Sequence, residues 1–324
     1  MAFSFCGLRK IRQFLILVIL FFVFFIAVFY LHRERLKCRA NPLKNIAVVL
    51  VFNSPYYENV PILQKMYGNV FGKLVFCGEQ PRTGGINYRP DIVLNINQGH
   101  LAYHCAAKLI QLYPGFSGYL YGNDDMIINW WNLVNRDQNK IWQGAQIVDF
   151  TQTLHGKINT EWIWWNSYMG LTACRKFYQE IIELSKTSLS FDSMYHVALH
   201  NGNGHPRCGK GWSDFFYIPG RFTTAFVQLS EIAYKHKTFL EIAVNNILRS
   251  LDYTQNFEQI NGVYLPDLGV EKNDPMLFWR KYYTHQLTFI HPFKFKVKDT
   301  IFNMERLDEK VITYTKYLNN KTYC

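Results

Sequence analysis

The 324-residue chain is 49% apolar and 17% aromatic, so it can enclose the core of one large domain or two modest ones. Its formal net charge is +11, of which +7 falls within residues 1–44, where eight Lys and Arg accompany one acidic residue. The remaining residues, 45–324, are therefore only mildly basic and contain no recognisable nucleic-acid-binding motif, which argues against nucleic acid as a partner.

An unbroken apolar run lies near the N-terminus. It covers the 18 residues 14–31, and a helix of that length, at ~1.5 Å per residue, nearly matches the hydrocarbon core of a bilayer. No small-residue cleavage site follows the run, so it predicts an uncleaved transmembrane signal anchor rather than a signal peptide that is removed. Residues 1–13 would then form a tail and residues 32–44 a short stem.

Two features bear on the orientation of this span, and they disagree. Five Lys and Arg follow it by residue 44 and three precede it, which does not favour a cytosolic N-terminus. The glycosylation sequon at Asn320 and the large region after the span favour a luminal C-terminus. We expect a single-pass type II protein of the Golgi or ER membrane, with a cytosolic tail, a luminal domain at 45–324 and a glycan on Asn320. Six of the seven cysteines would then lie in an oxidising lumen, with their pairing left open.

Strand and helix patterns alternate after residue 44. The apolar, β-branched run at 46–52 is typical of a strand that is buried on both faces. The next predicted elements are a helix that starts after Pro55 and runs to about Tyr67, strands at 73–77 and 91–96, and a helix at 100–113. Alternation of this kind predicts a parallel α/β sheet.

A short apolar strand at 119–121 leads directly into Asn123, Asp124 and Asp125. Two adjacent carboxylates just past a buried strand repel each other and lose hydration, which a hard cation between their oxygens would offset. Open α/β sheets bind ligands beyond the carboxyl ends of their strands, where this pair is expected to lie. The motif therefore indicates a divalent-metal site that holds a diphosphate, although Asn and Asp also favour ordinary turns.

The second half of the chain is richer in helix patterns. Its predicted elements are strands at 141–148, 168–173 and 212–219, helices at 174–185, 221–234 and 239–251, and a glycine-rich loop at 201–211. No internal repeat and no Pro/Ser-rich linker divides the region, so we expect a single domain.

The apolar run, the short stem, the α/β half ending in an Asp pair and a histidine near the C-terminus together resemble a type II membrane glycosyltransferase of the GT-A fold. This nucleotide-diphospho-sugar transferase superfamily implies a Rossmann-like, mixed and mostly parallel sheet flanked by helices. It also implies a divalent cation, often Mn²⁺, bound at a D-x-D-type motif together with the donor diphosphate. Here the match is Asn123-Asp124-Asp125. Asp125 is the implied metal ligand, Asp124 would meet the ribose or sugar, and Asn123 departs from the usual Asp.

The resemblance extends to a histidine and a lysine near the end of the domain. His291 would be a further metal ligand, and Lys294 would contact the diphosphate. An imidazole beside carboxylates suits Mn²⁺ better than Mg²⁺, and an ammonium group stabilises a departing phosphate. The alternative is that His291 is simply a surface residue before a turn-forming proline.

Transfer with inversion requires a carboxylate that accepts the proton of the acceptor hydroxyl. Asp214, after the glycine-rich loop, and Glu241 are the candidates. Glu241 has a structural alternative, because Thr238 and Glu241 are spaced as the capping box of a helix, and Asp214 could equally be a turn residue.

The predicted function is metal-assisted transfer of a sugar from a nucleotide-diphosphate donor to a hydroxyl on a glycan, protein or lipid. Two other functions remain open. One is a non-catalytic membrane-anchored binding protein on the same fold, favoured by Asn123, and the other is a metal-dependent nucleotidyltransferase.

Overall fold

The computed structural model describes residues 15–29, 40–81, 88–144, 148–153, 162–265, 274–295 and 299–322. The chain divides into two units. Pro42–Thr315 forms one of them, and the other comprises Met1–Asn41 and Lys316–Cys324.

The N-terminal apolar run is helical where the structure describes it. This helix covers residues 15–29, and its apolar side chains are exposed. Within the described ranges no helix is both long and apolar enough to cross a membrane, so the transmembrane helix predicted at 14–31 is not found. At ~1.5 Å per residue, residues 15–29 reach less than the ~30 Å of a bilayer core.

The larger unit is built on a seven-stranded mixed sheet with the strand order β10-β6-β9-β4-β1-β2-β3. Its strands are β1 (Ile46–Phe52), β2 (Lys73–Gly78), β3 (Ile92–Val93), β4 (Gly118–Asn123), β6 (Trp142–Gln143), β9 (Phe215–Pro219) and β10 (Glu258–Gln259). Strands β3, β2, β1 and β4 are mutually parallel, whereas β9 runs antiparallel to both β4 and β6. The predicted mixed, mostly parallel sheet flanked by helices is therefore confirmed.

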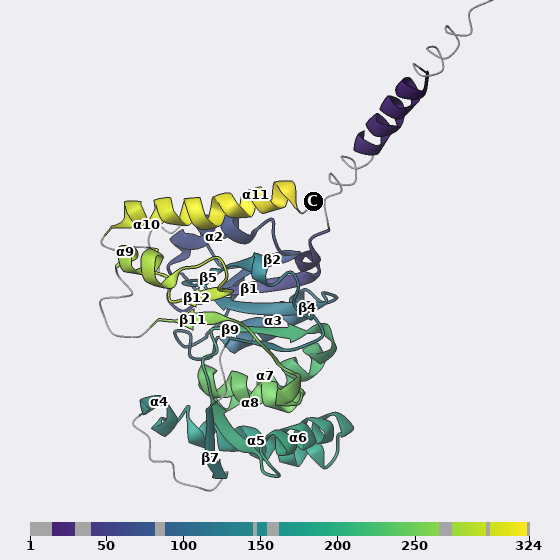
Figure 1. The fold of residues 1–324 in the computed structure, drawn as a ribbon. Coiled ribbons are helices and arrows are strands. Elements are labelled where there is room, and N and C mark those ends of the chain that lie inside the picture. The colour runs from purple at the N-terminus through teal and green to yellow at the C-terminus, as the bar shows by residue number, and fades with distance from the viewer. Residues whose placement is uncertain are drawn as a thin grey trace, which may run out of the picture. The chain divides into compact units, whose positions relative to one another are not determined.

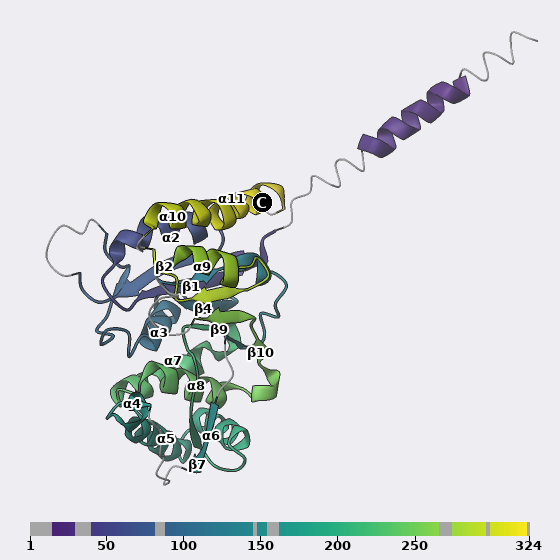
Figure 2. The same ribbon diagram turned by 60° about the vertical axis from the view of Figure 1, so that its left-hand side comes forward.

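Helices on both faces explain why all seven residues of β1 are buried. Helix α3 (Tyr103–Leu112) packs against β1 and β4 and against α7 (Thr223–Lys235), and α2 (Val60–Tyr67) packs against β2. Figures 1 and 2 show α2 and α3 on opposite sides of the sheet. A strand covered in this way needs apolar side chains on both of its faces, as its sequence has.

Two smaller sheets complete the strand arrangement. One has the order β11-β12-β5, with β11 at Gly262–Tyr264, β12 at Phe289–His291 and β5 at Ile127–Ile128. The other pairs β7 (Val148–Thr153) with β8 (Arg207–Lys210). Because β5 follows β4 after a short turn that contains Asp124 and Asp125, the pairing of β12 with β5 brings the end of the domain close to the Asp pair. Figure 1 shows β5 and β12 together.

The remaining helices lie mostly in the second half. They are α4 (Ile163–Asn166), α5 (Leu171–Ser185), α6 (Leu189–Asn201), α8 (Leu240–Leu251), α9 (Pro275–Leu277), α10 (Thr300–Leu307) and α11 (Thr313–Lys321), with π-helical turns at Phe278–Tyr282 and Asp308–Ile312 and 3₁₀ turns at Pro42–Asn45, Tyr57–Asn59, Trp130–Asn132, Gly220–Phe222 and Thr254–Asn256. Disulfides join β2 to α3 through Cys77–Cys105, and α5 to β8 through Cys174–Cys208.

Several predicted elements differ from the observed ones. The strand predicted at 168–173 is wrong, because α5 already begins at Leu171 and buries residues at helical spacing, among them Cys174, Phe177 and Ile181. The strand predicted at 91–96 shortens to β3, and the one predicted at 141–148 is β6 followed by the separate strand β7. Helix α6 was not predicted.

Candidate active site

The Asp pair lies at the carboxyl edge of the parallel strands, as predicted. Strands β1 and β4 are in register, with Val51 opposite Asn123. Asp124 continues this pairing by donating its backbone N–H to the carbonyl of Val51 at 2.9 Å. Asn53, the residue that follows β1, therefore reaches the same edge of the sheet as Asp124 and Asp125.

Strand β9 brings Asp214 to this edge from the opposite direction. It is antiparallel to β4, and Phe215 pairs with Gly122, so Asp214 is level with Asn123. The amide Nδ2 of Asn123 donates to Oδ1 of Asp214 at 2.6 Å, and the hydroxyl of Tyr121 donates to Oδ1 of Asn123 at 3.0 Å. Asn123 is fully buried, and its observed partner is the candidate base. The predicted role of Asn123 in cofactor binding stays a prediction.

Antiparallel pairing of β12 with β5 places His291 and Lys294 beside Asp125. Nε2 of His291 lies 3.1 Å from Oδ1 of Asp125 and 3.9 Å from Oδ1 of Asp214. The ammonium group of Lys294 donates to Oδ2 of Asp125 at 2.5 Å. The backbone N–H of Phe293 donates to the carbonyl of Asp125, which holds the two segments together. The predicted proximity of His291 to Asp125 is confirmed.

The pKa values of the two carboxyl groups of the pair are shifted in opposite directions. Burial alone would raise the pKa of Asp125, but the cations of His291 and Lys294 outweigh it and hold that pKa below its usual range. Burial and the charge of Asp125 instead raise the pKa of Asp124 well above its usual range. Burial would lower the pKa of His291, yet Asp214 and Asp125 raise it to about 9. Burial also raises the pKa of Asp214. A charged Asp125 thus lies between two cations, next to a carboxyl group that favours its neutral form.

Two of these side chains fit a divalent cation. Oδ1 of Asp125 is buried, and Nε2 of His291 forms an ion pair with it at 3.1 Å. Their separation of 3.1 Å matches neighbouring ligands of an octahedral ion with bonds of ~2.1 Å. Across the described ranges, no group of three His, Cys, Asp or Glu side chains is arranged around a common metal position.

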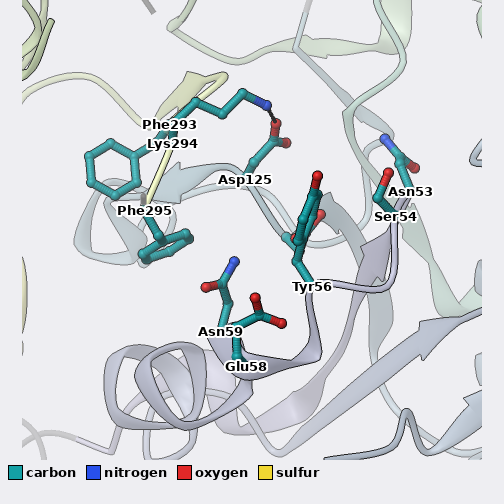
Figure 3. Close-up of a pocket in the computed structure, with 10 residues that line it drawn as sticks. Asn53, Ser54, Tyr56, Glu58, Asn59, Asp125, Phe293, Lys294 and Phe295 are labelled. Carbon is teal, nitrogen blue, oxygen red and sulfur yellow. Dashed lines mark hydrogen bonds and ion pairs between the residues drawn. The ribbon is translucent and has the colours of Figure 1, made fainter. Parts of the chain in front are cut away.

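A cavity of about 500 Å³ opens in front of Asp125. Its lining comes from the ends of β1 and β4 and from the segment after β12: Asn53, Ser54, Tyr56, Glu58, Asn59, Asp124, Asp125, Phe293, Lys294 and Phe295. Figure 3 shows Lys294 and Asp125 meeting in one part of the lining, with Glu58 and Asn59 in another. The volume is in the range of natural ligand pockets. Asn53 and Tyr56 were not predicted as site residues, although they follow a buried strand as the Asp pair does.

Glu241 does not form the capping box considered from the sequence. Helix α8 begins at Leu240 with Phe239 as its N-cap, and no side chain caps it. The hydroxyl of Thr238 is buried and has no hydrogen-bond partner among the described residues. The backbone N–H of Phe239, the N-cap residue, donates to the carbonyl of Met169 at 2.9 Å.

The Glu241 carboxylate acts on Tyr264 through its charge. Burial, Asp214 and Glu241, in that order, raise the pKa of Tyr264 well above its usual range. Oδ1 of Asp214 lies 3.9 Å from Nε2 of His291. The role of Glu241 as a catalytic base stays a prediction.

A buried amide network positions the loop that leads to Asp214. Nδ2 of Asn245 on α8 donates to the carbonyls of Gly211 and Glu241 and to Oγ of Ser213. Oδ1 of Asn245 accepts from Nε2 of Gln143 at 2.7 Å. Asn is a poor helix former. An Asn among the apolar residues of a predicted helix was therefore the sequence signal that Asn245 has a positioning role.

Sequence comparison finds distant similarity to two proteins named as probable glycosyltransferases. No family model matches the chain. It is 21% identical over 218 residues, 67% of its length, to the probable glycosyltransferase STELLO1 of Arabidopsis thaliana, and 22% identical over 229 residues, 70% of its length, to the probable glycosyltransferase STELLO2 of the same plant. The matched regions cover 26% and 27% of those relatives, so the chain spans about a quarter of their length.

Proposed function

We propose that the protein transfers a sugar from a nucleotide-diphosphate sugar to a hydroxyl acceptor, with the help of a divalent cation. The observation that carries the proposal is the convergence of Asp125, His291, Lys294 and Asp214 at one edge of the sheet, beside a cavity. The four residues come from three separate segments. A turn that served only the fold would not require this convergence.

In the proposal each residue of the cluster has a distinct role. Asp125 and His291 would hold the cation, and Mn²⁺ suits their mixed oxygen and nitrogen donors. Bound there, the cation would neutralise negative charge on the departing diphosphate. Lys294 contributes a second positive charge at the cavity wall, and Asp124 lines the same cavity as a carboxyl group that favours its neutral form and can donate a hydrogen bond. This set suits the diphosphate and ribose of a donor.

Asp214 would accept the proton of the acceptor hydroxyl. Its raised pKa makes it a stronger base than an ordinary aspartate, once it is ionised. Asn123 orients this carboxylate through its 2.6 Å hydrogen bond. In the sequence, Asn in place of Asp at position 123 favoured a non-catalytic protein. In the proposal Asn123 positions Asp214, and both proposed metal ligands are still present.

The proposal includes location in the lumen of the Golgi or ER. Its support is the pair of disulfides, Cys77–Cys105 and Cys174–Cys208. Structural disulfides form and persist in oxidising compartments and are rare in the cytosol.

Calorimetric titration of the full chain with UDP and with GDP, in the presence and absence of Mn²⁺, tests the proposed function. We expect binding that depends on Mn²⁺ and weakens at least tenfold in Asp125→Ala, because the variant lacks one metal ligand. Asp308→Ala is the matched control, since it removes a carboxylate that pairs with Lys65 on the surface. Nucleotide binding that does not depend on Mn²⁺, or that has the same affinity in Asp125→Ala, would contradict the proposal.

A further inference from the structure

Trp212 remains 45% exposed although it lies only two residues before Asp214. Its indole stacks on the ring of Tyr264, with the ring centroids 4.9 Å apart and the planes inclined by 20°. Tyr264 in turn makes a T-shaped contact with the imidazole of His291, at 5.9 Å between centroids. We call the stacked pair of Trp212 and Tyr264 the aromatic platform. It adjoins both a proposed metal ligand and the candidate base.

The backbone on both sides of Trp212 is held by buried hydrogen bonds. Nδ2 of Asn245 donates to the carbonyl of Gly211 at 2.9 Å and to Oγ of Ser213 at 3.0 Å. The amide of Gly211 donates to the carbonyl of Glu241 at 3.1 Å. Because the residues before and after the indole are fixed, the platform loses little conformational entropy when a ligand binds. Rigid aromatic side chains of this kind give large contact area at low entropic cost.

The chemistry around the aromatic platform selects among possible ligands. Asp214 lies two residues after Trp212 in the sequence, and the charges of Asp214 and Glu241 both act on Tyr264. An acyl chain on this surface would strip water from those carboxylates without replacing their hydrogen bonds, which is costly. A sugar ring has an apolar C–H face that can cover the exposed indole, and its hydroxyl groups can donate to the carboxylates. Pockets with an aromatic wall and a few placed polar groups bind such amphipathic ligands.

We propose that the aromatic platform binds a sugar ring of the acceptor, so that the acceptor of this protein is a glycan. The inference rests on the proposed function for the statement that the bound sugar is an acceptor. The ring would stack on Trp212 with one hydroxyl directed at Asp214. That carboxylate lies 3.9 Å from His291, so an acceptor hydroxyl held there would be close to the proposed cation.

Binding of four trisaccharides tests the inference: cellotriose, chitotriose, mannotriose and xylotriose, each titrated into the full chain and followed by saturation-transfer NMR. We expect the native protein to bind at least one of them, with the strongest saturation on C–H protons of a single sugar face. Trp212→Ala should weaken that binding about tenfold, as the loss of one stacking contact implies. Trp212→Phe keeps a ring and should stay within about threefold of native. UDP binding with Mn²⁺ should not change in either variant.

Tyr168→Ala is the matched control, because it removes another exposed aromatic ring, 67% exposed and outside the described site. Native protein that binds none of the four trisaccharides would overturn the inference, as would equal affinities in native and Trp212→Ala. The saturation pattern is measured on native protein, so it decides the question even if a variant folds poorly. Trisaccharide binding without Mn²⁺-dependent UDP binding would instead support the platform and refute the proposed donor site.

Discussion

Asn123 joins Tyr121 to Asp214 inside the protein, and replacing it with aspartate would place two buried carboxylates against each other. Its Nδ2 lies 2.6 Å from Oδ1 of Asp214. At that distance and an effective dielectric constant of ~20, two negative charges repel by about 6 kcal/mol. Protonating an ordinary aspartate at pH 8 costs about as much, and burial already raises the pKa of Asp214. We therefore expect the folded Asn123→Asp variant to retain one proton on the pair.

The variant should lose stability as pH rises. Its folded state binds one more proton than the unfolded chain, whose carboxyl groups ionise near pH ~4, so the free energy of unfolding falls with increasing pH. One proton corresponds to about 1.4 kcal/mol per pH unit. The stability difference from the native protein should thus widen by about 2.7 kcal/mol between pH 6 and pH 8.

Urea unfolding of both proteins at pH 6, 7 and 8 measures this difference. The control is Asn203→Asp, which makes the same chemical change at an exposed residue and should show little pH dependence. A deficit that stays constant across the three pH values, or no deficit at all, would refute the reasoning and with it the role of Asn123 in positioning Asp214.

Three further predictions concern the site and the C-terminus. The pKa of His291 is raised to about 9, and only a neutral imidazole could bind the proposed cation. The Mn²⁺ affinity measured by calorimetry should therefore rise up to tenfold per pH unit from 7 to 9, and His291→Ala should flatten that dependence. Lys294→Ala should weaken UDP binding about tenfold without weakening the binding of Mn²⁺ alone, because it removes a positive charge beside Asp125. Lys65→Ala, which breaks a surface ion pair, should change neither. Asn320 is exposed in the structure, and endoglycosidase treatment of the protein from eukaryotic cells should increase its gel mobility, a shift that is lost in Asn320→Gln; an unchanged native band would contradict luminal exposure.

The features that the sequence predicted correctly are those with a strong local pattern. The apolar run at 46–52 needed burial on both faces, and that need implied helices on both sides of a parallel sheet. The place of Asp124 and Asp125 followed from the same reasoning, since polar residues after such a strand emerge at the carboxyl edge. The resemblance supplied His291 and Lys294 as candidates, and the structure confirms that both lie beside Asp125.

The tertiary structure decided what depends on partners far away in the chain. Asn123 resembled a degenerate metal ligand in the sequence, yet its partner is Asp214, which lies 91 residues later. The sequence left the disulfide pairing open, and the folded packing brings Cys77 to Cys105 and Cys174 to Cys208.

Local propensity also failed where long-range contacts outweighed it. The run at 168–173 has the residues of a strand, but α5 gains more by burying one helical face against its neighbours. Trp212 is a similar case, because neither its stacking on Tyr264 nor its exposure beside Asp214 follows from its neighbours in sequence. The sequence by itself determined which segments are buried and where polar residues leave the sheet. Only the closed fold determined which of those polar residues meet, because side-chain contacts across such distances depend on how all the layers pack.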